Sequence, residues 1–127
     1  MIYLDSSIAL AQILAEPQRV PDRLWDETLV SSRLLAYEVW NRIHVQGDTR
    51  LHDAAHELIG RVSLLDLDPS CLARALEPFP LAVPTLDALH LASIAYLRER
   101  RVDVALASFD QRLLKAAHAL KIPLYEC

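Results

Sequence analysis

The chain has 127 residues, of which 53% are hydrophobic and only 2 are glycine. This length and composition predict one compact domain covering residues 1–127, and they exclude a disordered or low-complexity chain. The formal net charge of −4 argues against a general nucleic-acid-binding protein, because such proteins usually carry a basic surface.

Short apolar runs alternate with longer helical patterns from one end of the chain to the other. The short runs predict strands at residues 2–4, 29–32, 63–67, 103–108 and 122–125. The longer patterns predict helices at residues 6–16, 33–45, 48–60, 85–100 and 110–120, with shorter helices beginning at Pro21 and Pro69. This alternation predicts an α/β fold, a three-layer α/β/α sandwich in which helices cover both faces of a central parallel sheet of about five strands.

Individual residues set the expected ends of these helices. Pro17 is expected to end the first helix, because proline cannot continue it. Gly47 is expected to end the helix at 33–45, and Thr85 to cap the long helix that follows it. Residues 78–84 contain three prolines, which predicts an extended linker.

The cysteines and the N-terminal residues bear on where the protein works. Cys71 and Cys127 form no disulfide framework, which favours the reducing environment of the cytoplasm. The first residues show no basic segment followed by a long apolar run, so we expect no signal peptide. No run of about 18 apolar residues occurs, so we expect no transmembrane span.

Four acidic residues are expected to gather at one edge of the predicted sheet. Asp5 closes the first strand and Asp110 follows the fourth, and parallel sheets bind ligands beyond the carboxyl ends of their strands. Asp87 lies in the first turn of the long helix, and Glu38 lies in a helix among apolar neighbours. Clustered carboxylates repel one another unless a hard divalent cation neutralises them. This acidic quartet therefore predicts a Mg²⁺ or Mn²⁺ site suited to hydrolysis of a phosphate ester.

Each acid also has an ordinary structural interpretation. Asp5 and Asp110 could cap the helices that follow them, and Asp87 could interact with the dipole of its own helix. Glu38 could pair with Arg42 one turn later. One shared metal site explains all four positions together, and the sequence therefore favours it.

The histidines suggest weaker alternatives. His52 and His56 share one helical face, as in the zinc-protease motif, but Asp53 stands where that motif requires glutamate, so a polar surface is the better interpretation. His90 follows Asp87 by three residues on the same face. It could hydrogen-bond a carboxylate of the site, or it could be a satisfied core residue.

The acids and their surroundings resemble the motifs of the PIN-domain family, and most closely those of its VapC-type ribonuclease toxins. Residues 2–7 (IYLDSS) resemble the first motif, and residues 37–39 (YEV) the second. Residues 86–92 (LDALHLA) resemble the third motif, and residues 107–113 (ASFDQRL) the fourth. The resemblance spans the whole chain, with the motifs in the family's order.

The resemblance implies a Mg²⁺- or Mn²⁺-dependent endoribonuclease that acts as the toxin of a toxin–antitoxin pair. It further implies a homodimer, inhibition by a cognate antitoxin, and an RNA substrate, with tRNA among the candidates. We expect the antitoxin to cover apolar positions of the first helix, namely Ile8, Leu10, Ile13 and Leu14. By matching position, the catalytic and metal-binding residues would be Asp5, Glu38, Asp87 and Asp110.

Smaller polar groups complete the expected site. Ser6 and Ser108 match hydroxyl positions that often line the family's pocket, and they are candidates for substrate binding. Basic residues are needed to contact phosphates, and the candidates are Arg112, Arg33, Arg42 and Lys115.

Three alternatives compete with an active nuclease. A response-regulator receiver has an acidic pocket in a similar sheet, but it has paired acids after its first strand, whereas Asp5 is followed by Ser6 and Ser7. A phosphatase of the haloacid dehalogenase type would likewise need an acid at Ser7. A catalytically inert PIN-like binding module would keep the acids without turnover, and the sequence leaves that alternative open.

Overall fold

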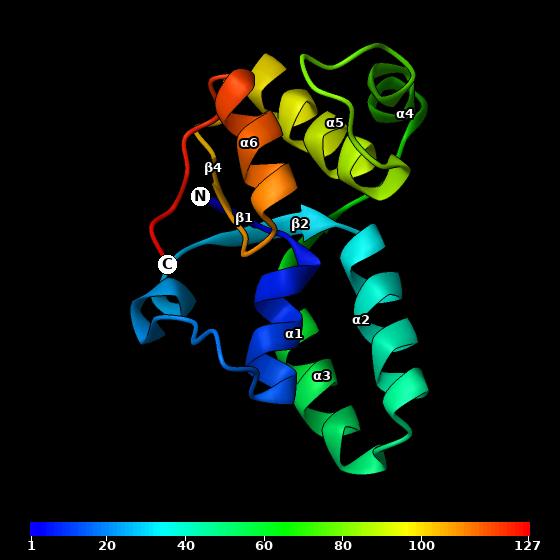
Figure 1. The fold of residues 1–127 in the computed structure, drawn as a ribbon, viewed down its shortest axis with the longest axis vertical. Coiled ribbons are helices and arrows are strands. Elements are labelled where there is room, and N and C mark those ends of the chain that lie inside the picture. The colour runs from blue at the N-terminus through cyan, green and yellow to red at the C-terminus, as the bar shows by residue number, and fades with distance from the viewer.

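The sheet determines where every element of the fold lies. The computed structural model describes residues 1–127 and contains a 4-stranded sheet in the order β3-β2-β1-β4 (Figure 1). All neighbouring strands are parallel. The strands are β1 (Ile2–Leu4), β2 (Leu29–Ser32), β3 (Ser63–Leu65) and β4 (Ala105–Ala107). The predicted α/β class and parallel sheet are therefore confirmed.

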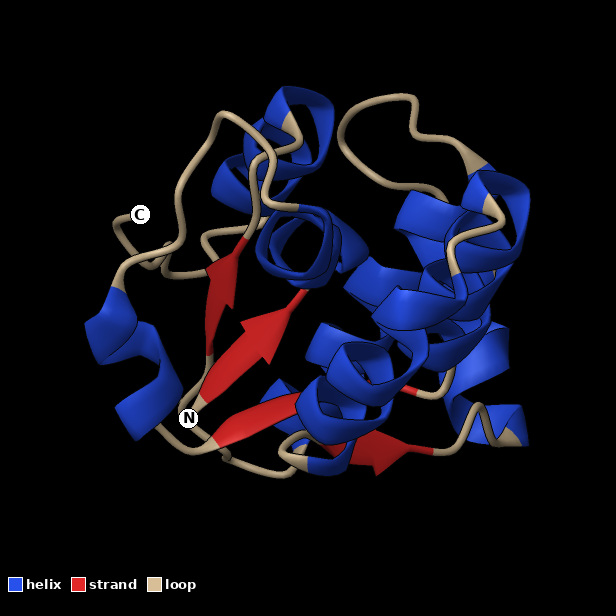
Figure 2. Cartoon of the chain, turned by 90° about the horizontal axis from the view of Figure 1, so that it is seen from below, coloured by secondary structure: helices blue, strands red, loops and turns tan.

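Helices cover both faces of this sheet, as expected for parallel strands joined by crossover connections. The helices are α1 (Ser6–Leu14), α2 (Leu34–Gln46), α3 (His52–Gly60), α4 (Pro69–Ala75), α5 (Thr85–Glu99) and α6 (Gln111–Ala119), with 3₁₀ turns η1 (Asp22–Asp26) and η2 (Thr49–Leu51). Helices α1, α2 and α3 pack on one face, and α5 and α6 pack on the other (Figures 1 and 2).

The central strand divides the core into two parts. Successive side chains of a strand point to opposite faces, so Ile2 and Leu4 join the cluster under α1, α2 and α3, whereas Tyr3 joins the cluster under α5 and α6. Leu106 of β4 joins the second cluster in the same way. Strand β1 lies between β2 and β4 and is buried along its whole length. Asp5, the next residue, therefore lies at the carboxyl edge of an interior strand and is itself buried.

The order of strands creates a switch point beside β1. The chain builds β2 and then β3 on one side of β1, and it crosses back through α4 and α5 to place β4 on the other side. Ligands of open α/β sheets bind at such switch points, beyond the carboxyl ends of the strands. The positions that follow β1 and β4 therefore face the place where a site is expected.

The last predicted strand is much shorter than expected. Residues 122–125 form a single parallel bridge, between Leu106 and Leu124, in place of a regular fifth strand. Pro123 has no N–H to donate, which limits how far the pairing can extend. Two backbone bonds of 2.8 Å still attach the segment to β4, one to the carbonyl of Pro123 and one from the N–H of Tyr125.

Most helix boundaries lie near their predicted positions. Gly47 ends α2 in the left-handed region with φ of 70°, as expected, whereas α1 ends at Leu14, ahead of the predicted stop. The predicted capping role of Thr85 is wrong, because Pro84 occupies the cap position without a side-chain bond and Thr85 is the first helical residue. No helix here combines the length and the apolar character needed to cross a bilayer.

Candidate active site

A cleft of about 440 Å³ opens at the carboxyl edge of β1 and β4. Its lining includes all four members of the acidic quartet, which come from four separate segments of the chain. Ser6, Arg42 and Arg112 line the same cleft. The structure therefore brings together the acids that the sequence predicted as one group.

Asp5 is the most firmly held acid of the quartet. Its side chain is buried, with the residue only 5% exposed, and it caps α1 by accepting a bond of 3.2 Å from the backbone N–H of Ser7. The hydroxyl of Ser7 donates to the second oxygen at 2.7 Å, and the Ser108 hydroxyl donates to the same oxygen. Helix capping and a place in the cleft are thus compatible at Asp5.

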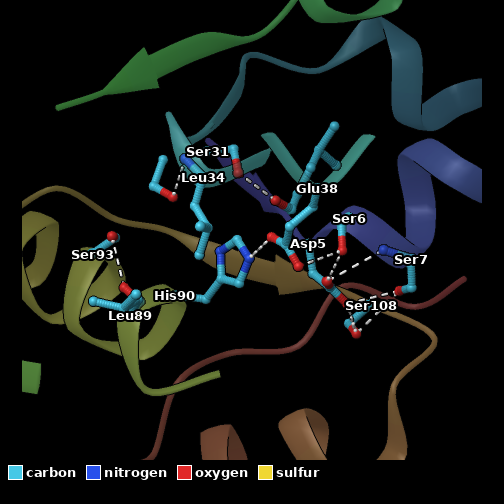
Figure 3. Close-up of polar contacts among 12 residues, drawn as sticks. Asp5, Ser6, Ser7, Ser31, Leu34, Glu38, Leu89, His90, Ser93 and Ser108 are labelled. Carbon is cyan, nitrogen blue, oxygen red and sulfur yellow. Dashed lines mark hydrogen bonds and ion pairs between the residues drawn. The ribbon is translucent and has the colours of Figure 1, made fainter. Parts of the chain in front are cut away.

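Glu38 reaches the cleft from α2 and uses both of its carboxylate oxygens (Figure 3). Oε1 accepts a bond of 2.6 Å from Nε2 of His90, and Oε2 accepts one of 3.1 Å from the Ser6 hydroxyl. Arg42 instead lies 4.0 Å from an oxygen of Glu16. The structural alternative of a Glu38–Arg42 pair is therefore wrong.

The hydroxyl of Ser6 lies between two carboxylates. Its oxygen is 3.1 Å from Glu38 Oε2 and 3.3 Å from Asp5 Oδ1. A serine hydroxyl has one hydrogen to donate, so Ser6 can satisfy only one of these acceptors at a time. The other acceptor then faces the cleft without that bond, which keeps the site electronegative.

Asp87 and Asp110 are less completely satisfied than Asp5. Asp110 caps α6 through one oxygen, which accepts bonds of 3.0 Å from the N–H of Arg112 and 3.4 Å from that of Leu113. Oδ2 of Asp87 is buried and has no hydrogen-bond partner. Burial raises the pKa of Asp87, and the nearby carboxylates of Asp110 and Asp5 raise it further. An orphaned acidic oxygen among like charges fits a position for a cation.

The side-chain oxygens are not yet in a coordinating arrangement. No group of three or more His, Cys, Asp or Glu side chains lies close enough together to hold a metal ion. In the quartet, this agrees with the hydrogen bonds, which turn carboxylate oxygens of Asp5 and Glu38 toward serines and His90.

His90 proves to be both a core residue and a partner of the site. The residue is only 1% exposed, and its ring bonds to Glu38 and to the hydroxyl of Tyr3. Burial disfavours protonation of the ring, but Tyr3 and Glu38 outweigh that effect and raise the pKa of His90 to about 10. Its spacing from Asp87 suggested a carboxylate partner, but nothing in the sequence identified that partner as Glu38.

Ser7 is the residue at the site that sequence reasoning missed. Its hydroxyl donates to Asp5 and accepts a bond of 2.9 Å from the backbone N–H of Phe109, so it connects the ends of β1 and β4. A second hydroxyl directly after Asp5 was the available signal. The rings of His52 and His56 both pack against Trp40, at centroid distances of 5.3 and 4.6 Å.

Comparison with known proteins gives this cleft a family context. The family model for the PIN domain matches residues 2–119. This chain belongs to the PIN-domain family. Two relatives from Mycobacterium tuberculosis are similar to this chain over most of their length. Ribonuclease VapC46 is 32% identical over 123 residues, covering 94% of this chain and 92% of that protein. Ribonuclease VapC47 is 27% identical over 121 residues, covering 90% and 88%.

Similarity to a solved structure confirms the fold. The crystal structure of Mycobacterium tuberculosis VapC20, a Sarcin-Ricin loop cleaving toxin, matches with a TM-score of 0.70. The match covers 91% of this chain and 95% of that chain at 19% identity. The predicted membership of the PIN-domain family and homology to VapC ribonucleases are therefore confirmed. The receiver and phosphatase alternatives are set aside.

Proposed function

We propose that this PIN-domain protein is a metal-dependent endoribonuclease and the toxin of a toxin–antitoxin pair. The observation that carries the proposal is the convergence of Asp5, Glu38, Asp87 and Asp110 on one cleft, with a buried oxygen of Asp87 left unsatisfied. Homology to VapC46 and VapC47, both named ribonucleases, supports this choice of chemistry.

The quartet would hold Mg²⁺ or Mn²⁺, since carboxylate oxygens suit both ions. When bound, the ion neutralises charge on the scissile phosphate and activates water for attack. The carboxylates orient that water and accept its proton, while serine hydroxyls hold the carboxylates in place. In-line attack on the phosphodiester would leave a 5′-phosphate and a 3′-hydroxyl.

Positive charge for RNA binding must come from local residues, because the chain has a net charge of −4. Arg42 and Arg112 line the cleft, and Arg112 takes part in no ion pair. We assign Arg112 to a phosphate contact. Arg33 is instead paired with Asp66 at 2.6 Å. Ser6 and Ser108 line or adjoin the same edge, but both already bond to acids of the quartet.

The proposed partners are an RNA, a cognate antitoxin and a second copy of the chain, and the proposed location is the cytoplasm. The expected antitoxin surface on α1 needs correction, because Ile8 and Ile13 are buried in the core. Apolar surface open to a partner lies elsewhere, in a groove of about 610 Å³ between α4, α5 and the segment that joins them. Leu76 of this groove is 89% exposed.

The test is cleavage of defined RNAs by purified protein with Mg²⁺, with Mn²⁺ and with EDTA. Sequencing the 5′ ends of the fragments would identify the substrate among tRNA and other RNAs. Glu16→Gln is a matched control, because Glu16 lies in the same cleft outside the quartet. The proposal predicts metal-dependent cleavage that survives Glu16→Gln and is lost in Asp5→Asn. Binding of RNA without cleavage under all these conditions would favour the inert binding module.

A further inference from the structure

A buried hydrogen-bonded chain lies behind Glu38. The Tyr3 hydroxyl lies 2.7 Å from Nδ1 of His90, and Nε2 of the same ring lies 2.6 Å from Glu38 Oε1. Tyr3 and His90 are 0% and 1% exposed, and their rings pack edge to face with an interplanar angle of 82°. Neither residue lines the cleft, so neither is placed to touch a substrate.

The direction of the bond to Glu38 does not depend on the protonation state of His90. In the neutral ring, the Tyr3 hydroxyl donates to Nδ1 and the N–H at Nε2 donates to the carboxylate. In the protonated ring, both nitrogen atoms are donors, and Nε2 still donates to Glu38. Either arrangement fixes Oε1 of Glu38 and leaves Oε2 to Ser6 and the cleft.

His90 also connects the two faces of the sheet. Glu38 comes from α2 and His90 from α5, and these helices pack on opposite faces (Figure 1). The contact passes beyond the carboxyl edge of the sheet, where Figure 3 shows the His90 ring directed at Glu38. Asp87 lies one turn before His90 on α5. The bond therefore constrains where the acids of α2 and α5 lie relative to each other.

Given the proposed nuclease function, we infer that His90, held by Tyr3, is a positioning residue that sets the orientation of Glu38 at the metal site. Loss of His90 leaves Glu38 bonded only to Ser6 and able to turn away from the other acids. Residues that orient a metal ligand from behind typically change affinity or activity by about 10- to 100-fold. Loss of the Tyr3 hydroxyl has a smaller effect, because the ring remains and only its anchoring is weakened.

The experiment compares His90→Leu, His90→Gln and Tyr3→Phe with the wild type. Ser93→Ala is the matched control, because Ser93 is also buried on α5 but bonds to the Leu89 carbonyl and approaches Cys71, away from the cleft. Mn²⁺ affinity is measured by calorimetry without RNA, and kcat and KM are measured with RNA. Melting temperatures without metal report the stability of each variant.

We expect His90→Leu to bind Mn²⁺ about 10- to 100-fold more weakly and to lose kcat at nearly constant KM. His90→Gln keeps an amide donor and should recover most of both quantities, and Tyr3→Phe should lose less than His90→Leu. Ser93→Ala should change only stability. If folded His90→Leu and Tyr3→Phe match the wild type in Mn²⁺ affinity and kcat, the positioning role is wrong.

The two proposals can fail separately. A wild-type protein that binds Mn²⁺ but cuts no RNA contradicts the nuclease, while weaker Mn²⁺ binding by His90→Leu would still support the positioning role. If His90→Leu does not fold, Tyr3→Phe and His90→Gln decide the matter by the same measurements. If His90→Gln, His90→Leu and Ser93→Ala lose Mn²⁺ affinity and kcat equally, and only in proportion to their loss of melting temperature, His90 is a core residue without a positioning role.

Discussion

The two halves of the acidic quartet are held in different ways. Asp5 and Glu38 are fixed by serines, by a helix N-terminus and by His90, so that every one of their carboxylate oxygens has a partner. Asp87 has a buried oxygen without a partner, and Asp110 uses one oxygen to cap α6. The first half is a rigid frame built by folding, whereas the second half is left with unbalanced negative charge.

This difference suggests that the two halves of the quartet respond differently to a bound cation. Hydrogen bonds hold the side chains of Asp5 and Glu38 in place and offset the cost of burying their polar oxygens side by side. Burial and the neighbouring acids disfavour the charged form of Asp87, and its pKa is raised accordingly. A cation should therefore change the energy of the Asp87 half far more than that of the Asp5 half.

The largest effect is expected from Asp5→Asn, which tests the hydrogen-bonded half of the quartet, formed by Asp5 and Glu38. The variant keeps the shape and one capping oxygen, so it should fold, but it loses the charge at the centre of the site. We expect cleavage of RNA to fall by more than about 100-fold, beyond the range typical for residues that only support a ligand. Circular dichroism checks the fold, and turnover of the folded variant at saturating Mg²⁺ would remove Asp5 from the chemistry.

The next effect concerns metal binding and the second half of the quartet. Metal that binds only the folded state should stabilise it by about 2.7 kcal/mol at a hundredfold excess over Kd. For a domain of this size that corresponds to a rise in melting temperature on the order of 5 to 15 °C. Asp87→Asn should remove most of the rise, and Glu16→Gln should keep it. Equal shifts in wild type and Asp87→Asn would show that the acids do not share a metal.

A smaller effect is expected for Asp87→Asn without metal. The pKa of Asp87 is raised above its ordinary value of 3.8. The folded state therefore binds the proton more tightly than the unfolded state, and this contribution to stability is lost as pH rises through the folded pKa. Asn cannot ionise, so the variant should melt a few degrees above the wild type at neutral pH in EDTA. The two should converge at a pH below 3.8, and a constant difference at all pH values would contradict this cause.

The sequence was sufficient to predict the strands, the helices and the α/β class, because the patterns that indicate them are local in the chain. Alternating runs identified strands and helices, and Asp5 directly after a buried strand identified the edge of the sheet. Thr85 misled because a favourable capping residue stood next to Pro84, which took the cap position. A fifth regular strand was predicted at residues 122–125 from their apolar pattern, but only an isolated bridge forms there. The pattern does not account for the backbone N–H that Pro123 lacks.

Long-range partners could not be predicted in the same way. His90 and Glu38 are 52 positions apart, and their bond depends on how α2 and α5 meet beyond the sheet edge. The sequence indicated that Glu38 is an acidic residue among apolar neighbours on its helix. Arg42, four residues later on the same helix, was the partner that local spacing suggested. The packing of α5 against the sheet brings His90 to Glu38 instead, and only the three-dimensional structure reveals this contact.

The smallest effect is expected at the rim of the cleft, where Arg112 tests whether the second half of the quartet also receives the substrate. Arg112 follows Asp110 in α6 and its side chain lines the cleft. Arg112→Gln should raise KM for RNA several-fold with little change in kcat, and it should reduce the slope of binding against salt by about one. Arg100→Gln is the matched control, because it removes the same charge at the far end of α5 from the cleft. Equal changes in both variants would indicate only the overall charge of the protein. An effect confined to Arg112 would place the phosphate on the Asp87–Asp110 side, where the guanidinium and the proposed cation would together offset the negative charge of the acids.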